Sequence, residues 1–360
     1  MVLANGPLCG DCSAMATLRE FRSASAPLVR PMDAVRRLQA RLWLCGLVVA
    51  LLPGRSFAQS VAGPGRQSLS DAWWTGPVAA AGAGTLPPGH LLFEPYFYDV
   101  RAGHSHSMGS SAFVVYGVAD RIAMGFIPVV GYNKPSVGQS SSRVGLGDVS
   151  MLAQYRLTQF HEGSWMPIVS VLAEETFPTG KYDRLGSRPS DGFGAGAYTT
   201  TLSIYSQTYF WMPNGRILRT RLDLSQAFSA HATVRDVSVY GTASGFRGTA
   251  RPGSSFFADA SGEYSVTKNW VLALDVNYGQ HGSTNVRGDD ILHAVAGGNA
   301  PGNAPSVAMS SGWSDAVGFI PAVEYNRTST VGVIFGVRRI MPGKNSAGSV
   351  TPVMAINLVR

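Results

Sequence analysis

The sequence is poor in charged residues and in cysteine. Asp, Glu, Lys and Arg make up 14% of its 360 residues, against about a quarter in ordinary soluble domains. The 3 cysteines, Cys9, Cys12 and Cys45, all lie near the amino terminus. So little charge argues against a charge-rich helical protein and against a disordered chain. If the amino-terminal segment is removed, no disulfide can stabilise the remainder.

Long apolar runs are also missing from most of the chain. After Ala58 no stretch approaches the 18 consecutive apolar residues of a membrane-spanning helix. Glycine is abundant instead, with 42 residues. These features leave two classes, an all-β protein with many turns or a membrane protein that crosses the bilayer with strands.

The amino-terminal segment has the pattern of a Sec signal peptide. Arg36, Arg37 and Arg41 precede an apolar run from Leu42 to Leu52, and Ser56-Phe57-Ala58 supplies small residues before the expected cleavage near Ala58. Residues 1–58 are therefore expected to be a leader. Residues 1–31 precede a second methionine, so a start at position 32 stays open.

The leader accounts for most of the positive charge. It contains 7 Arg, no Lys and 3 acidic residues, which leaves 22 basic and 19 acidic groups in the remainder. A net charge of +3 gives no electrostatic reason to expect a nucleic acid partner.

The body of the chain alternates apolar and polar residues with a period of two. In residues 269–279, Trp270, Leu272, Leu274, Val276 and Tyr278 share one face. Similar patterns occur in residues 147–157, 217–228, 258–266, 331–338 and 354–358. Alternation at this period predicts β-strands with one apolar and one polar face.

The longest patterns extend over about 11 residues, which matches a tilted crossing of the bilayer. Aromatic residues lie at or near many predicted strand ends, where interfacial girdles belong. They are Tyr96, Tyr98, Tyr132, Tyr155, Trp165, Tyr205, Trp211, Tyr264, Trp270, Tyr278, Trp313 and Tyr325. An exported all-β chain with such strands predicts an antiparallel outer-membrane β-barrel, with a soluble β-sandwich as the alternative.

Long and short connections between the predicted strands alternate, as in outer-membrane barrels. Tight links are expected near 119–120, 267–268 and 326–328, and long ones at 99–110, 133–146, 178–191, 244–253, 280–312 and 341–349. Residues 192–216 fit one long strand or two short ones. The prediction is therefore a barrel of twelve strands over residues 91–360, with fourteen as the alternative, preceded by a periplasmic lead-in at residues 59–90.

Charged residues of the polar parity are expected to line the lumen. They are Arg156, Arg219, Arg221, Asp223, Asp259, Glu263, Asp275, Glu324 and Arg338. Ion pairs that hold a narrow barrel together are the first interpretation, and a polar permeation path is the second.

No catalytic site, metal site or cofactor is predicted. Hydrolase elbows, Walker loops, zinc-protease motifs and dinucleotide fingerprints are missing after residue 58. His104 and His106 lie in a Gly/Ser-rich stretch with too few partners for a structural metal site.

Three segments resemble the MetA-pathway of phenol degradation family. These are Gly145-Leu146-Gly147-Asp148, the alternating residues 153–157, and Pro178-Thr179-Gly180-Lys181. The resemblance covers most of residues 91–360 and implies an outer-membrane barrel that accompanies aromatic-compound catabolism. No catalytic residue is carried over from it.

The leading hypothesis is a channel or uptake protein in the outer membrane of a Gram-negative bacterium, for passive entry of small hydrophobic or aromatic solutes. The alternatives are a non-conducting scaffold or adhesin and, less favoured, an outer-membrane enzyme. Expected partners are outer-membrane lipid, the solute and the barrel-assembly machinery, although the chain ends in Val359-Arg360 rather than an aromatic residue.

Overall fold

A computed structural model describes residues 65–292 and 305–360. The predicted leader, residues 1–58, lies outside the described residues. Apart from two short 3-10 helices, η2 (Leu69–Asp71) and η3 (Pro189–Asp191), and the helical residues Ile291 and Leu292, the regular structure in the described parts is strand. No helix in these parts is long and apolar enough to span a membrane.

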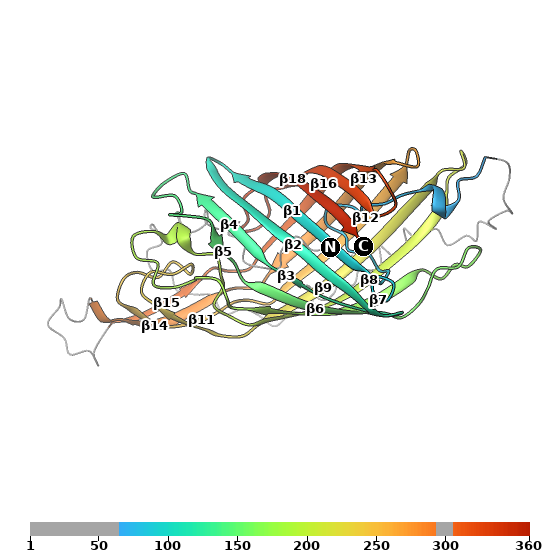
Figure 1. The fold of residues 1–360 in the computed structure, drawn as a ribbon. Coiled ribbons are helices and arrows are strands. Elements are labelled where there is room, and N and C mark those ends of the chain that lie inside the picture. Colours follow the sequence, from blue (N-terminus) through green and yellow to red (C-terminus); the bar gives the residue numbers. More distant parts are fainter. Residues whose placement is uncertain (1–64, 293–304) are drawn as a thin grey trace.

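One antiparallel sheet forms the body of the molecule (Figure 1). Its strands are β1 (Leu91–Ala102), β2 (Ser105–Ala119), β3 (Ile122–Ile127), β4 (Val129–Lys134), β5 (Gly145–Leu146), β6 (Val149–Arg156), β7 (Ile168–Phe177), β8 (Thr199–Trp211), β9 (Ile217–Ser229), β12 (Ser255–Ser265), β13 (Trp270–His281), β16 (Ser314–Asn326), β17 (Val331–Ile340) and β18 (Ser349–Val359).

The sheet closes on itself because β1 pairs with both β18 and β2. Of its 14 segments, β3 and β4 form one strand interrupted at Pro128, and β5 and β6 form one interrupted at Gly147-Asp148. Proline cannot donate a backbone hydrogen bond, which explains the first interruption. The result is a closed barrel of twelve strands, which confirms the all-β fold and the preferred strand number.

The two ends of the barrel differ. At the turn end, the links between β2 and β3, β8 and β9, β12 and β13, and β16 and β17 are short. The opposite end, called the loop end here, carries the β4–β5, β7–β8 and β17–β18 loops. The expected long connection at residues 99–110 is wrong, because β1 and β2 are joined by the tight turn Gly103-His104. Residues 199–211 form one strand, β8, which resolves the ambiguity at 192–216.

A second sheet extends the barrel wall at the loop end (Figure 1). It contains β10 (Ala232–Arg235), β11 (Phe246–Arg251), β14 (Asn285–Asp290) and β15 (Ser306–Ser310) in that order. The extension continues the β9–β12 and β13–β16 hairpins beyond the barrel, because its strands follow or precede theirs directly in the chain.

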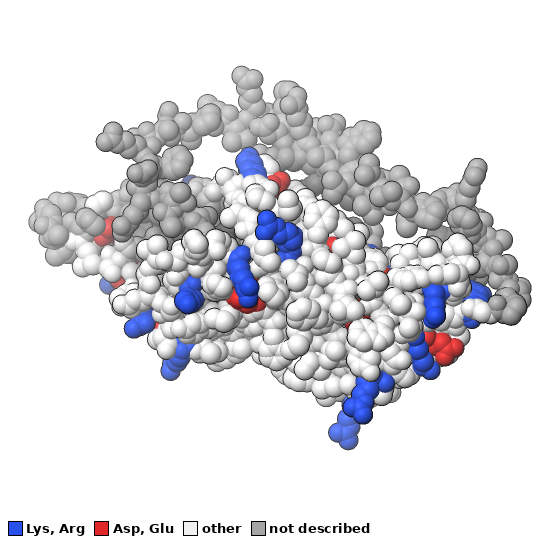
Figure 2. Space-filling model, turned by 90° about the horizontal axis from the view of Figure 1, so that it is seen from above, with Lys and Arg blue, Asp and Glu red and all other residues white. Residues whose placement is uncertain are grey.

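Large apolar side chains cover the outside of the barrel. Leu202, Leu272, Leu274 and Phe335 are about half exposed, while their sequence neighbours on the inner face are buried. The face shown in Figure 2 has an uncharged middle region, with Lys and Arg side chains to either side of it. The outer surface therefore matches the lipid-facing belt of a membrane barrel.

Three tyrosines from the expected aromatic girdles face inward instead. Tyr96, Tyr98 and Tyr205 are buried inside the barrel, so their assignment to the interface is wrong. They lie at inner positions of β1 and β8, and proximity to a strand end does not by itself tell which face a residue occupies. Trp270 and Tyr325 do lie outside near the turn end, with ring centroids 4.8 Å apart.

A charge introduced on the outer belt should strongly destabilise the barrel. For Leu274→Arg, in the middle of β13 and facing outward, we expect a loss of about 2–4 kcal/mol of unfolding free energy. Leu358→Arg, on the outer face near the end of β18, should cost only about 0–1 kcal/mol because it reaches the interface. Reversible urea unfolding in lipid vesicles measures both values. Equal costs for the two variants would contradict the assigned belt.

Candidate functional site: the occupied lumen

The lumen of the barrel is occupied by the chain itself. Residues 73–84, called the lumen segment here, precede β1, and Val78, Ala79, Ala80 and Ala83 in it are fully buried. The backbone amides of this segment donate hydrogen bonds to side chains on the inner barrel wall, and three of its carbonyl oxygens accept hydrogen bonds from them. A lead-in outside the barrel, as expected for residues 59–90, does not describe this part of the chain.

The residue types of the lumen segment explain why it fits. Residues 79–84 are exclusively Ala and Gly, so the backbone can approach the wall closely. Gly76 has φ +116°, a conformation that favours glycine, and Arg221 lies against it. The segment has no regular secondary structure between residues 73 and 84, so its backbone groups need partners from the wall.

Carboxylates on the wall supply many of these partners. Glu324 Oε2 accepts hydrogen bonds from the amides of Thr75 (2.7 Å) and Gly76 (3.2 Å). Asp275 accepts from Val78 (3.1 Å) and Ala80 (3.2 Å), and Asp223 accepts from Ala81. Three acidic side chains on three different strands thus hold one short segment.

Side-chain amide and guanidinium groups donate hydrogen bonds to carbonyl oxygens of the lumen segment. Arg221 Nη1 donates to the carbonyl oxygen of Ala80 (2.9 Å), and Gln154 Nε2 donates to that of Gly82 (2.9 Å). Asn326 Nδ2 donates to the carbonyl oxygen of Trp73 (3.0 Å). The hydrogen bonds to the lumen segment therefore come from β6, β9, β13 and β16.

A buried ion cluster lies beside the segment. Glu263 pairs with Arg219 in a bidentate arrangement, with Arg219 Nε 2.6 Å from Glu263 Oε2. Arg221 Nε lies 3.2 Å from the same oxygen. Strand register explains the main pair, because Glu263 of β12 lies directly opposite Arg219 of β9. The guanidinium carbon of Arg219 also lies 4.5 Å from the ring centroid of Trp74, so the cluster contacts the lumen segment directly.

The segment is fixed at the turn end as well. Lys268 lies in the β12–β13 turn, and its Nζ is 4.7 Å from the centroid of the Trp73 ring. The backbone amide of Trp73 donates a hydrogen bond to the carbonyl oxygen of Lys268. Its Nζ also lies 3.5 Å from Asp71 Oδ1. Hydrogen bonds from Ser68 and Lys268 lower the pKa of the Asp71 carboxyl.

An apolar cluster also lines the lumen. It joins the lumen segment to β1, β2, β3, β6, β7, β8, β16, β17 and β18. From the wall it contains Tyr96, Tyr98, Phe113, Ile127, Leu152, Ile168, Leu172, Tyr205, Ile320, Ile334, Val353 and Ala355. The lumen segment contributes Val78, Ala79 and Ala83. The segment is therefore held by hydrogen bonds to the wall and by apolar contact with this cluster.

The structure brings most of the predicted lumen residues together. Arg219, Arg221, Asp223, Asp259, Glu263, Asp275 and Glu324 are all buried inside the barrel. Arg338 occupies the inner row of β17 and is partly buried. Arg156 lies apart from them at the turn end, where Nη2 is 3.2 Å from Asp120 Oδ1. A part in solute passage stays a proposal for all nine.

Two important lumen residues were not predicted from sequence. Glu94 of β1 is buried, with its Oε1 3.3 Å from Asn357 Nδ2. Its inner-face neighbours are Leu92, Tyr96 and Tyr98, so β1 shows no alternation of polarity that would reveal the lumen side. Gln154, at a buried inner position of β6, is polar but uncharged, so a selection of charged residues does not include it.

The segments that carry the family resemblance meet at one point of the wall. Asp148 accepts hydrogen bonds from the amides of Gly180 (2.8 Å) and Ala195 (2.7 Å). Thr179 Oγ1 donates to the carbonyl oxygen of Gly147 (3.0 Å). Any Cβ atom on Gly194 would collide with Gly180. These residues attach the β7–β8 loop to the interrupted strand, which is a structural role.

Comparison with known proteins identifies the family. Residues 76–304 match the family model described as "Putative MetA-pathway of phenol degradation", and the chain belongs to this family. None of the curated proteins matches the sequence significantly.

Two solved structures are similar to the chain, and the first has the same fold. The COG4313 outer membrane channel from Pseudomonas putida F1 is 15% identical, with 79% of this chain and 100% of that chain covered and a TM-score of 0.55. The NanC porin is 10% identical, with 74% of this chain and 98% of that chain covered and a TM-score of 0.40. The chain thus belongs to this family and has an antiparallel β-barrel fold of the outer-membrane type.

Proposed function

We propose that the protein admits small hydrophobic or aromatic solutes across the outer membrane by passive diffusion. The observation that carries the proposal is the apolar cluster in the lumen, where aromatic and aliphatic wall residues pack with small side chains of the lumen segment. Contacts of this kind are dispersive and weak individually. They can be exchanged for contacts with an apolar solute more cheaply than the hydrogen bonds that hold the segment.

The proposed route follows this apolar cluster. A solute enters from the loop end, moves between the lumen segment and the apolar residues of the wall, and leaves at the turn end, which we place in the periplasm. The carboxylates of β9, β13 and β16 keep the segment attached to the wall while the solute passes. Flux follows the concentration gradient. The family description, which refers to phenol degradation, supports an aromatic class of solute.

Uptake of an aromatic compound tests the proposal. Cells that lack the protein should accumulate radiolabelled toluene or phenol more slowly than cells that contain it, over a panel of concentrations. Leu172→Asn, which places an amide on the inner apolar wall, should slow uptake. Leu202→Asn makes the same change on the lipid-facing side of the neighbouring strand and should leave it unchanged.

Normal heat-dependent gel mobility of both variants shows that they are folded. Uptake that is independent of the protein for every aromatic compound in the panel would overturn the proposal.

The occupied lumen also favours a second function, a non-conducting scaffold in the outer membrane. Hydrogen bonds from four strands hold the lumen segment, which suits a permanently filled barrel. A scaffold predicts that neither ions nor apolar solutes pass, so vesicles containing the pure protein would take up labelled toluene no faster than empty vesicles.

A further inference from the structure

The two faces of the loop-end extension differ sharply. One face packs Ala232, Val234, Phe246, Ala250 and Val286 into an apolar cluster. Tyr182 and Tyr240, from the loops at the barrel mouth, pack against it, so this face is turned toward the barrel axis. The opposite face continues the outer wall and is exposed, with the four arginines Arg235, Arg247, Arg251 and Arg287. A fifth exposed arginine, Arg184 of the β7–β8 loop, lies beside β10.

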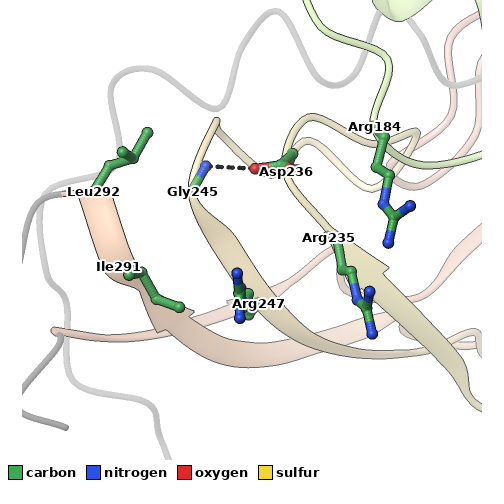
Figure 3. A pocket seen from close by; sticks show the side chains of 7 residues that line it. All are labelled: Arg184, Arg235, Asp236, Gly245, Arg247, Ile291 and Leu292. Carbon is green, nitrogen blue, oxygen red and sulfur yellow. Dashed lines mark hydrogen bonds between the residues drawn. The ribbon is translucent and has the colours of Figure 1, made fainter. Parts of the chain in front are cut away.

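Three of these arginines line one cavity of about 330 Å³ (Figure 3). Arg235 of β10 lies directly opposite Arg247 of β11 in the strand register. Arg184 joins them because its amide donates to the carbonyl oxygen of Arg235 (3.1 Å). Like charges directly opposite each other destabilise a strand pair, so this arrangement carries a cost that a bound anion would remove.

Three aspartates lie near these arginines. Asp236 lines the cavity, and its Oδ1 accepts a hydrogen bond from the Gly245 amide (2.9 Å). Asp183 Oδ2 accepts one from the Arg235 amide (3.1 Å), and Asp289 lies opposite Arg247 in the register of β11 and β14. Within residues 65–292 and 305–360, none of the three arginines forms an ion pair. Three guanidinium groups on one cavity form a good site for phosphate, which they bind in a bidentate geometry.

The height of the cavity above the membrane indicates which kind of phosphate-bearing molecule reaches it. Phe228 is an exposed apolar residue near the loop end of β9, and Arg235 lies seven positions further along the chain. At about 3.3 Å per residue and a strand tilt near 45°, the cavity stands about 15 Å above the apolar belt. This is beyond the acyl chains, at the level of the saccharides of an outer-leaflet glycolipid.

We propose that Arg184, Arg235 and Arg247 bind a phosphorylated saccharide headgroup of an outer-leaflet lipid. The sugar phosphate sits in the cavity, and its negative charge offsets the repulsion between Arg235 and Arg247. The lipid thereby holds the loop-end extension against the surface of the membrane. Binding does not depend on solute passage through the lumen.

Binding of lipopolysaccharide to the protein in phosphatidylcholine nanodiscs tests this inference. Lipopolysaccharide with a phosphorylated inner core should bind R235Q/R247Q about tenfold or more weakly than the unchanged protein. The matched control is R121Q/R327Q, which removes the same charge from exposed positions at the turn end and should bind normally. Lipopolysaccharide from which the phosphates have been removed should bind the unchanged protein as weakly as R235Q/R247Q binds the phosphorylated form.

Arg235→Glu separates binding from folding. This variant replaces the like-charge pair with an opposite-charge pair, so it should keep or gain thermal stability in nanodiscs without lipopolysaccharide, yet lose binding. Unchanged binding by R235Q/R247Q, or an equal loss in R121Q/R327Q, would overturn the proposal. Displacement of the lipid by low millimolar inorganic phosphate would also overturn it, because the site would then recognise a free anion rather than a lipid.

Discussion

Deletion of residues 73–84 is expected to turn the barrel into an open channel. Without the lumen segment, the interior of a twelve-stranded barrel is wider than that of eight-stranded barrels, which side chains just fill. Single-channel conductance in planar bilayers should therefore rise roughly tenfold over the unchanged protein. The permeability to sugars in liposome swelling should rise with it.

The opened channel should also select cations. More carboxylates than guanidinium groups remain on the inner wall after the deletion. They are Glu94, Asp223, Asp259, Glu263, Asp275 and Glu324, against Arg219, Arg221 and Arg338. Rings of acidic side chains favour cations in a pore, so the reversal potential in a salt gradient should shift toward that of the cation.

A shortened chain needs its own control. Removal of residues 344–347 from the exposed β17–β18 loop shortens the chain without touching the lumen, and conductance should stay at its original level. If the deletion of residues 73–84 gives a folded barrel with unchanged conductance, the segment does not close the lumen.

Glu263→Ala should be the most destabilising single substitution in the lumen. The change leaves Arg219 and Arg221 buried without the carboxylate that both contact. Breaking a buried ion pair by removing one partner costs about 3–5 kcal/mol. Urea unfolding in lipid vesicles measures the loss.

Asp120→Ala provides the comparison for this prediction. Asp120 also pairs with an arginine, Arg156, but its side chain is 78% exposed. Exposed ion pairs contribute about 0–1 kcal/mol, so this variant should unfold almost like the original protein. Similar losses for the two variants would show that Glu263 is not a buried structural charge.

The barrel could be predicted from sequence because the inner and outer faces of its strands contact different surroundings, the lumen and the lipid. Strands β9, β12 and β13 alternate charged and apolar residues, and Arg219, Asp259 and Asp275 reveal the inner face. The same logic failed on β1, where both faces are apolar and Glu94 stands alone. Polarity indicates the lumen side only where the lumen is polar.

The lumen segment could not be predicted in this way. A run of Ala and Gly has neither periodicity nor charge, and such composition is also typical of a flexible linker. An indirect signal was present, since buried carboxylates such as Asp275 and Glu324 outnumber the arginines on the inner face and must find other donors. The sequence does not tell which backbone amides provide them.

Cross-linking of the lumen segment to the wall tests the central claim, that residues 73–84 lie inside the closed barrel. A Cβ atom at Gly332, on the inner face of β17, would touch the Thr75 hydroxyl. Since all 3 native cysteines precede residue 58, T75C/G332C has no competing thiols if the leader is removed. T75C/V331C is the control, because Val331 faces outward.

The measurement is the number of thiols that react with a maleimide polymer in outer-membrane preparations after mild oxidation. If the lumen is occupied, T75C/G332C forms a disulfide and has no reactive thiol. The control T75C/V331C then has two free thiols after denaturation. Two free thiols in both variants, with residue 75 open to the polymer before denaturation, would contradict the account.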